Sequence, residues 1–336
     1  MRSATSCRGA KRSLALGLAL GIGAAVPATA MSPLQEGVYA RGGVEVEHLS
    51  FGDETATGAY LDFNIGIATG TVFGLPVGIE LGAEGFSEED SASAFYGAGT
   101  FDTGFGVVGI GVPRFALDKY VSTPKLGGFR LIEAIDLGLI DGRGVSGLYY
   151  LTSSDVPYGI SYDLAGENFG FGLSYHEYDD EDGTSVIQAA GNVRAGLMVF
   201  GAGAEYLDSR AGDAEFYTAS VALQTERFDL GAQHSRLETT IDFGELVTDD
   251  FGEALDELGV GSLTAEGQVE ATKLWATWRP IKRLDLTASY LAFDGGNEEL
   301  YGLNARYNLA GMFVEAGAVD GFGNEPLYSA SVGFDF

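Results

Sequence analysis

The last segment of the sequence, Leu327-Tyr328-Ser329-Ala330-Ser331-Val332-Gly333-Phe334-Asp335-Phe336, alternates strictly between apolar and polar or small residues. In a β-strand, successive side chains point to opposite faces, so this pattern predicts one apolar and one polar face. A strand of a soluble sandwich would show the same alternation. The choice therefore depends on whether the rest of the chain repeats the pattern.

Fifteen further segments of about ten residues alternate in a related way, which is the length that a tilted membrane strand needs. Val77, Ile79 and Leu81, for example, alternate with Gly78 and Glu80. An even number of strands is what a closed single-chain bacterial barrel requires. The sixteen expected strands are 37–47, 59–68, 75–85, 91–100, 104–112, 155–164, 168–178, 184–194, 197–207, 214–224, 227–237, 268–278, 283–293, 299–309, 312–319 and 327–336.

The width of such a barrel decides which face points inward. Side chains cannot fill the interior of a sixteen-stranded barrel, so an apolar interior would leave a large void. The sequence therefore predicts an all-β fold, a transmembrane sixteen-stranded antiparallel β-barrel with its apolar faces toward lipid.

The connections between these strands alternate along the chain between two kinds, which differ in length and charge. Every second connection is short, as at 195–196 and 310–311, whereas the others are longer and acidic, as at 88–90 and 294–298. Outer-membrane barrels have this asymmetry between short inner turns and long outer loops. Two outer connections are much longer than the rest: 113–154, with an apolar helical face within 131–139, and 238–267. In the latter, Phe251, Leu255 and Leu258 predict a short amphipathic helix.

Residues 1–30 predict a secretory signal peptide, leaving 31–336 as the barrel. Four basic residues precede an apolar run from Leu14 to Val26, and Ala28-Thr29-Ala30 supplies the cleavage pattern. Removal of this segment leaves 15 of the 19 Lys and Arg residues against all 48 Asp and Glu, a formal net charge of −33 in place of −29. The acidity argues against nucleic acid as a partner. The single cysteine, Cys7, is removed with the segment, so no disulfide or thiolate site is expected.

Sixteen strands, a long third loop, short inner turns and a terminal phenylalanine together resemble the general porins, most closely the trimeric type of alphaproteobacteria. The segment from Tyr301 to Phe336 looks like the last three strands of that family. The resemblance implies a homotrimer in the Gram-negative outer membrane, in contact with lipid and lipopolysaccharide. It implies that Phe336, with Phe334, is the assembly signal, and that the third loop folds into the pore. It also implies passive diffusion of small hydrophilic solutes and ions.

The resemblance further implies a constriction in which acids of the third loop face bases of the wall. Charges at a narrow, poorly hydrated point select between ions. The candidates are the loop acids Asp118, Glu133, Asp136 and Asp141 and the inward-facing wall arginines Arg41, Arg194 and Arg306.

Other motifs have plainer interpretations. Gly104-Phe105-Gly106-Val107-Val108-Gly109 matches a dinucleotide-binding pattern, but no helix follows it, so a glycine-rich strand is expected. No histidine or serine has the spacing of a catalytic pair, and no enzymatic activity is expected. No cofactor is expected either, although the acids Asp179, Asp180 and Asp182 could weakly bind Ca²⁺ or Mg²⁺.

The aromatic residues Trp275, Trp278, Tyr290, Tyr301 and Tyr307 are candidates for the girdles at the membrane interfaces. The strand that contains Trp275 has two halves whose apolar faces disagree, so a β-bulge is expected within it.

These observations predict a porin with a preference for cations, because the acid excess would concentrate positive ions at the mouths of the pore. Two alternatives use the same barrel. One is a plugged barrel whose acidic loops bind an external partner at the cell surface. The other is a substrate-specific channel, which would need a track of inward arginine or aromatic residues.

Overall fold

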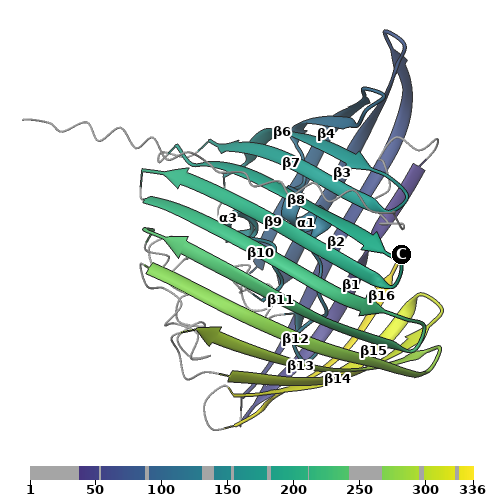
Figure 1. Ribbon diagram of the computed structural model, residues 1–336, viewed down its shortest axis with the longest axis vertical. Helices are drawn as coiled ribbons and strands as arrows, with labels where there is room; N and C mark the ends of the chain where they lie inside the picture. Colours follow the sequence, from purple (N-terminus) through teal and green to yellow (C-terminus); the bar gives the residue numbers. More distant parts are fainter. Residues whose placement is uncertain are drawn as a thin grey trace, which may run out of the picture.

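The computed structural model describes residues 38–52, 54–87, 91–130, 140–152, 155–179, 183–210, 212–241, 267–294, 299–321 and 325–336. Within them, sixteen antiparallel strands form a closed barrel in which each strand pairs with its sequence neighbours and β1 pairs with β16 (Figure 1). The prediction of a sixteen-stranded antiparallel barrel is confirmed. Among the described residues, no helix has both the length and the apolar content to cross a membrane.

β2 is the longest strand, and the described part of the segment between β5 and β6 contains two short helices. The elements are β1 Val38–Phe51, β2 Glu54–Val72, β3 Leu75–Ser87, β4 Ser91–Asp102, β5 Val107–Val112, α1 Ala116–Tyr120, α3 Val145–Thr152, β6 Pro157–Ala165, β7 Phe169–Tyr178, β8 Ser185–Ala195, β9 Met198–Ser209, β10 Gly212–Gln224, β11 Phe228–Thr239, β12 Gly267–Ile281, β13 Leu284–Asp294, β14 Glu299–Leu309, β15 Met312–Asp320 and β16 Leu327–Asp335.

The two faces of the strands follow the predicted alternation. In β16, Tyr328 is 55% exposed and Val332 44%, whereas Ser329 and Ser331 are 7% and 5% exposed. The exposed apolar residues lie on the outside of the barrel, and the inward positions are buried and largely polar. This arrangement fits an outer surface in contact with lipid.

The short turns are formed by residues with left-handed backbone conformations. Phe73 and Gly74 have φ of 53° and 83°, and Ala310 and Gly311 have φ of 48° and 96°. Positive φ at both central residues matches a type I′ hairpin turn, whose twist fits that of the paired strands. The predicted short connections are therefore tight two-residue turns at these positions.

The prediction of a β-bulge within the strand that contains Trp275 is wrong. The register between β11 and β12 is continuous, and the register of β12 with β13 shifts only beyond Trp278. Trp275 is 7% exposed and points inward, so it is not part of an outer girdle, whereas Trp278 is 48% exposed. The two halves of β12 disagree because Val269 and Ala271 point inward and pack with apolar residues there.

Those apolar residues form a cluster on the inward face near the ends of the strands that lead to the long connections. Strand residues from most of the barrel take part, together with residues of the segment between β5 and β6. The strand members include Leu49, Tyr178, Val186, Leu207, Phe216, Leu237, Leu291, Leu300, Val319 and Leu327. The inward face is therefore polar along most of its length and apolar at one end.

Candidate functional site

The segment between β5 and β6, residues 113–156, is called here the third connection. Of these residues, 113–130, 140–152 and 155–156 are described. Its described part contains five basic residues, and the inward faces of the neighbouring strands are rich in carboxylates. The bases are Arg114, Lys119, Lys125, Arg130 and Arg143.

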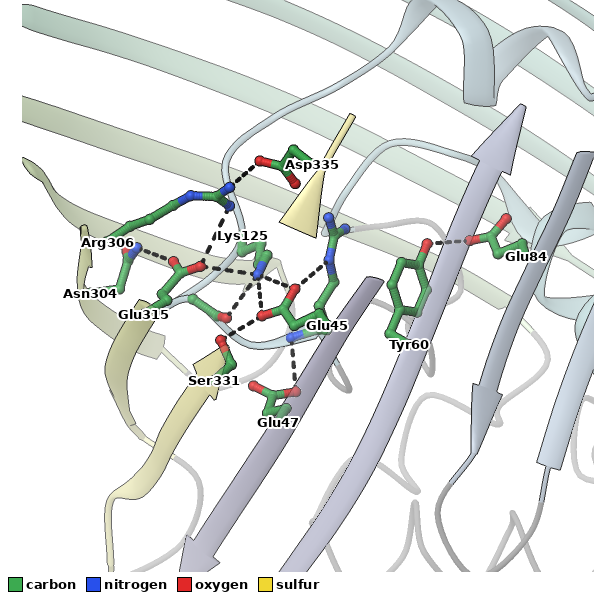
Figure 2. Close-up of polar contacts among 12 residues, drawn as sticks. Glu45, Glu47, Tyr60, Glu84, Lys125, Asn304, Arg306, Glu315, Ser331 and Asp335 are labelled. Carbon is green, nitrogen blue, oxygen red and sulfur yellow. Dashed lines mark hydrogen bonds and ion pairs between the residues drawn. The ribbon is translucent and has the colours of Figure 1, made fainter. Parts of the chain in front are cut away.

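Lys125 binds carboxylates from two strands that are distant in sequence (Figure 2). Its Nζ atom lies 2.8 Å from each carboxylate oxygen of Glu45 on β1 and 3.1 Å from Oε2 of Glu315 on β15. Ser331 on β16 donates a hydrogen bond of 2.6 Å to Glu45. Since Lys125, Glu45 and Glu315 are almost fully buried, water screens these charge-assisted contacts little.

The network around Lys125 extends to both sides. The Nε atom of Arg130 lies 3.3 Å from Glu45, and its guanidinium stacks 4.8 Å from the centre of the Tyr60 ring. Arg306 on β14 forms ion pairs with Glu315 and with Asp335 on β16 (Figure 2). Its guanidinium carbon also lies 3.6 Å from the centre of the Phe313 ring, a cation–π contact.

A second group of charges lies against β2 and β3. Arg114 binds Asp62 at 2.6 Å, and Arg143 binds Glu84 at 2.7 Å and Asp141 at 2.6 Å. Burial alone would lower the pKa of either guanidinium, but the surrounding carboxylates raise the pKa of both above the ordinary arginine value. Both remain charged at any physiological pH.

Asp118 on α1 lies within reach of this second group. Its Oδ2 atom is buried and has no hydrogen-bond partner among the residues that the structure describes. Burial and the carboxylate of Glu84 raise the pKa of Asp118 to about 7, although Arg143 and Arg114 oppose the shift. Asp118 is therefore only partly ionised at neutral pH.

The backbone of the third connection is held by polar side chains on the opposite wall. The N–H of Leu117 donates to Gln188 on β8 at 2.8 Å. The N–H groups of Val145 and Ser146 donate to Glu205 on β9 at 2.8 and 3.1 Å. A carboxylate at the start of α3 satisfies amides that have no partner within the helix and interacts favourably with the helix dipole.

The connection also approaches β15 at backbone distance. A Cβ atom on Gly317 would lie only 1.7 Å from the carbonyl oxygen of Gly127, and Gly127 itself has φ of +59°. A side chain at either position is incompatible with this approach. The described parts of the third connection thus contact the inward faces of strands on both sides of the barrel.

The sequence-predicted acids occupy different surroundings. Asp118 and Asp141 lie in the third connection, where Asp118 is buried and Asp141 is paired with Arg143. Glu133 and Asp136 lie outside the described residues. Asp179 follows β7, and Asp180 and Asp182 also lie outside the described part.

The three predicted wall arginines all point inward, but the structure does not bring them together on one wall. Arg306 belongs to the Lys125 network, and Arg194 donates to Gln224 on β10 at 2.5 Å. Arg41 has no ion-pair partner among the described residues and lines a cavity beside α1. Phe334 and Phe336 are exposed on the outer face, and the backbone N–H and C=O of Phe336 bond to Gly42 on β1.

The family resemblance implies acids on the third connection and bases on the wall, and the described residues have the reverse arrangement. The third connection supplies mainly bases, and the wall supplies their carboxylate partners. The alternation of β1 and β3 already placed glutamates inward, and five of the fifteen bases that follow residue 30 lie in one segment of the sequence. These two signals together could have predicted the pairing.

Among the residues that the structure describes, no group of three or more His, Cys, Asp or Glu residues is arranged to hold a metal ion.

No family model matches the sequence, and no curated protein matches it. Solved porin structures do match. A porin refined at 1.8 Å has a TM-score of 0.62 at 18% identity over 89% of this chain and 100% of the porin. Two engineered variants of the porin of Rhodopseudomonas blastica have TM-scores of 0.59 and 0.56 at 18% and 16% identity, with the same coverage. At this identity the likeness is one of fold, and the chain has the fold of these porins.

Proposed function

We propose that this protein is an outer-membrane channel through which small hydrophilic solutes and ions diffuse. The observation that carries the proposal is the closed sixteen-stranded barrel, apolar outside and polar inside, which it shares with solved porins. The likeness to channel proteins favours transport over catalysis. In the same proposal, residues 1–30 direct export, and the barrel lies in a Gram-negative outer membrane beside lipopolysaccharide as a homotrimer.

The third connection would narrow this channel. Its contacts with β15, β1, β2 and β3 on one side and with β8 and β9 on the other support such a role. The strong excess of acids over bases supports a preference for cations, because a negative potential at the mouths raises the local concentration of positive ions.

Single-channel recording in a planar bilayer, with a salt gradient to give the reversal potential, tests the proposal. Stepwise openings with a reversal potential that favours cations are expected. Openings in groups of three would support the trimer. A correctly folded, inserted barrel that never conducts would contradict the channel.

A second function is favoured by one observation, the apolar cluster on the inward face. Water-filled pores have polar linings, whereas here buried apolar residues of many strands pack with Phe115, Leu126 and Phe129 of the third connection. This packing supports a plugged barrel whose outer loops bind a partner. Absence of conductance in folded protein would favour this alternative.

A further inference from the structure

A cavity of about 500 Å³ lies where α1 faces the short-turn ends of β1, β4, β5 and β6. This volume falls within the range of roughly 300–1,000 Å³ that is typical of small-molecule pockets. The cavity is separate from the Lys125 network, and none of its lining residues takes part in the apolar cluster except Tyr120.

One cation of the cavity is already neutralised. Lys119 lies 2.9 Å from Asp163 and 3.9 Å from Glu80, and Tyr120 donates a hydrogen bond of 3.0 Å to Asp163. The two carboxylates raise the pKa of Lys119 despite its burial, so this ion pair persists at neutral pH. Lys119 is therefore held in place as part of the cavity wall.

Two opposite charges remain for a ligand. Arg41 has no ion-pair partner among the described residues. Among the hydrogen bonds of the described residues, Asp102 accepts one, from the N–H of Gly104 to one carboxylate oxygen at 2.7 Å. Beside them, the ring of Phe105 is 83% exposed and offers an apolar surface.

We propose that this cavity is a binding site for small zwitterions, in particular free α-amino acids, on their way through the channel. Arg41 would bind the carboxylate, because a guanidinium matches a carboxylate with two parallel hydrogen bonds. Asp102 would accept from the ammonium group, and Phe105 would contact an apolar side chain. The inference rests on the proposed channel for its transport aspect, but binding itself does not require an open pore.

The charge balance of the cavity disfavours the other ligand classes. Its lining contains three carboxylates and two bases, so a simple anion would be repelled by the excess negative charge. A simple cation would leave Arg41 without a partner. The hydroxyls of a neutral sugar can bond Arg41 and Asp102, but these hydrogen bonds carry a charge on the protein side only and are weaker than those of a zwitterion.

Calorimetric titration of L-serine into the detergent-purified barrel tests binding directly. Arg41→Gln and Asp102→Asn remove one charge each, and Asp102→Asn keeps the acceptor for Gly104. Each variant is expected to weaken binding at least about fivefold, as loss of a charge-assisted hydrogen bond implies. Arg227→Gln and Glu226→Gln, both in the exposed turn between β10 and β11, are matched controls and should bind as the unaltered protein does.

Proteoliposome swelling then compares L-serine with erythritol, a neutral solute of similar size. A higher rate for serine that falls toward the erythritol rate in Arg41→Gln is expected. Absence of serine binding, or equal binding in all variants, would overturn the inference. Binding without passage of either solute would leave the site intact and overturn the channel instead.

Discussion

The inner wall holds the third connection in two different ways on its two sides. On one side, strands β15, β16 and β1–β6, called here the acidic arc, present carboxylates to charged side chains of the connection. On the other side, strands β7–β13, called the opposite arc, mainly bind its backbone, through residues such as Gln188, Glu205 and Lys273. Backbone contacts depend on local geometry, whereas the ion pairs depend on charge. The two arcs should therefore respond differently to mutation, pH and salt.

The largest expected effect is at Lys125. Its replacement by methionine removes the nearest cation from the buried Glu45 and Glu315 and leaves them only the more distant Arg130 and Arg306, at 3.3 and 3.8 Å. The expected cost is about 3 kcal/mol, the lower end for a broken buried ion pair. Thermal unfolding should shift to lower temperature, and trypsin should cleave the connection at Arg130.

Lys282→Met, in the exposed turn between β12 and β13, is the matched control and should leave both measurements unchanged. Adding Glu315→Gln to Lys125→Met removes one of the two buried carboxylates that lost Lys125, so it should restore part of the stability. Unchanged trypsin resistance in Lys125→Met would show that the acidic arc does not hold the connection.

The second effect tests the opposite arc. Glu205→Ala leaves the N–H groups of Val145 and Ser146 and the hydroxyl of Ser146 without their acceptor, at a cost of about 2 kcal/mol. Trypsin cleavage at Arg143 should increase. Glu215→Ala removes a carboxylate whose one hydrogen bond within the described part of the chain comes from the exposed Tyr217 hydroxyl, so it should not change cleavage.

A smaller effect is expected from the pH dependence of Asp118. Because its pKa in the folded protein, about 7, lies above the unfolded value of about 4, the folded state binds more protons between these values. Stability should fall as pH rises from about 4 to 7 and stay low above that range.

Asp118→Asn removes this dependence, so it should raise the unfolding temperature by a few degrees at pH 8 and hardly at all at pH 4. Asp208→Asn, on the exposed outer face, is the control. Equal effects of Asp118→Asn at both pH values would mean that the carboxylate of Asp118 is not desolvated in the folded protein.

The smallest effect should come from salt. Buried ion pairs are screened little, so trypsin cleavage of the connection should change less than about twofold between 0.1 and 1 M NaCl. The exposed pair of Arg236 with Glu238 is screened and should not contribute to this measurement. A large increase in cleavage would indicate that water reaches the acidic arc.

The sequence was sufficient for the fold because its signals are local. Alternation within ten residues predicted the strands. The positions of Arg194 and Arg306 in the alternation of β8 and β14 correctly predicted that both side chains point into the barrel. Local alternation failed in β12, where Val269 and Ala271 are apolar yet face inward toward residues from other strands.

The site was harder to predict because its partners are far apart in the sequence. Lys125 and Glu315 are separated by 190 positions, and no local pattern reports such a contact. The family resemblance named Asp118 and Asp141 as acids of the constriction. Their partners and their burial became visible only when the connection was placed against the wall.

The position of Lys125 also has a consequence for the order of folding. Its partners lie on β1 and β15, and Ser331, which donates a hydrogen bond to its partner Glu45, lies on β16, so the binding site spans the seam where the two ends of the chain meet. Contacts between distant segments form only after the intervening chain has been ordered. The complete site for Lys125 therefore exists only in a barrel that has closed, and docking of the third connection follows closure of the seam.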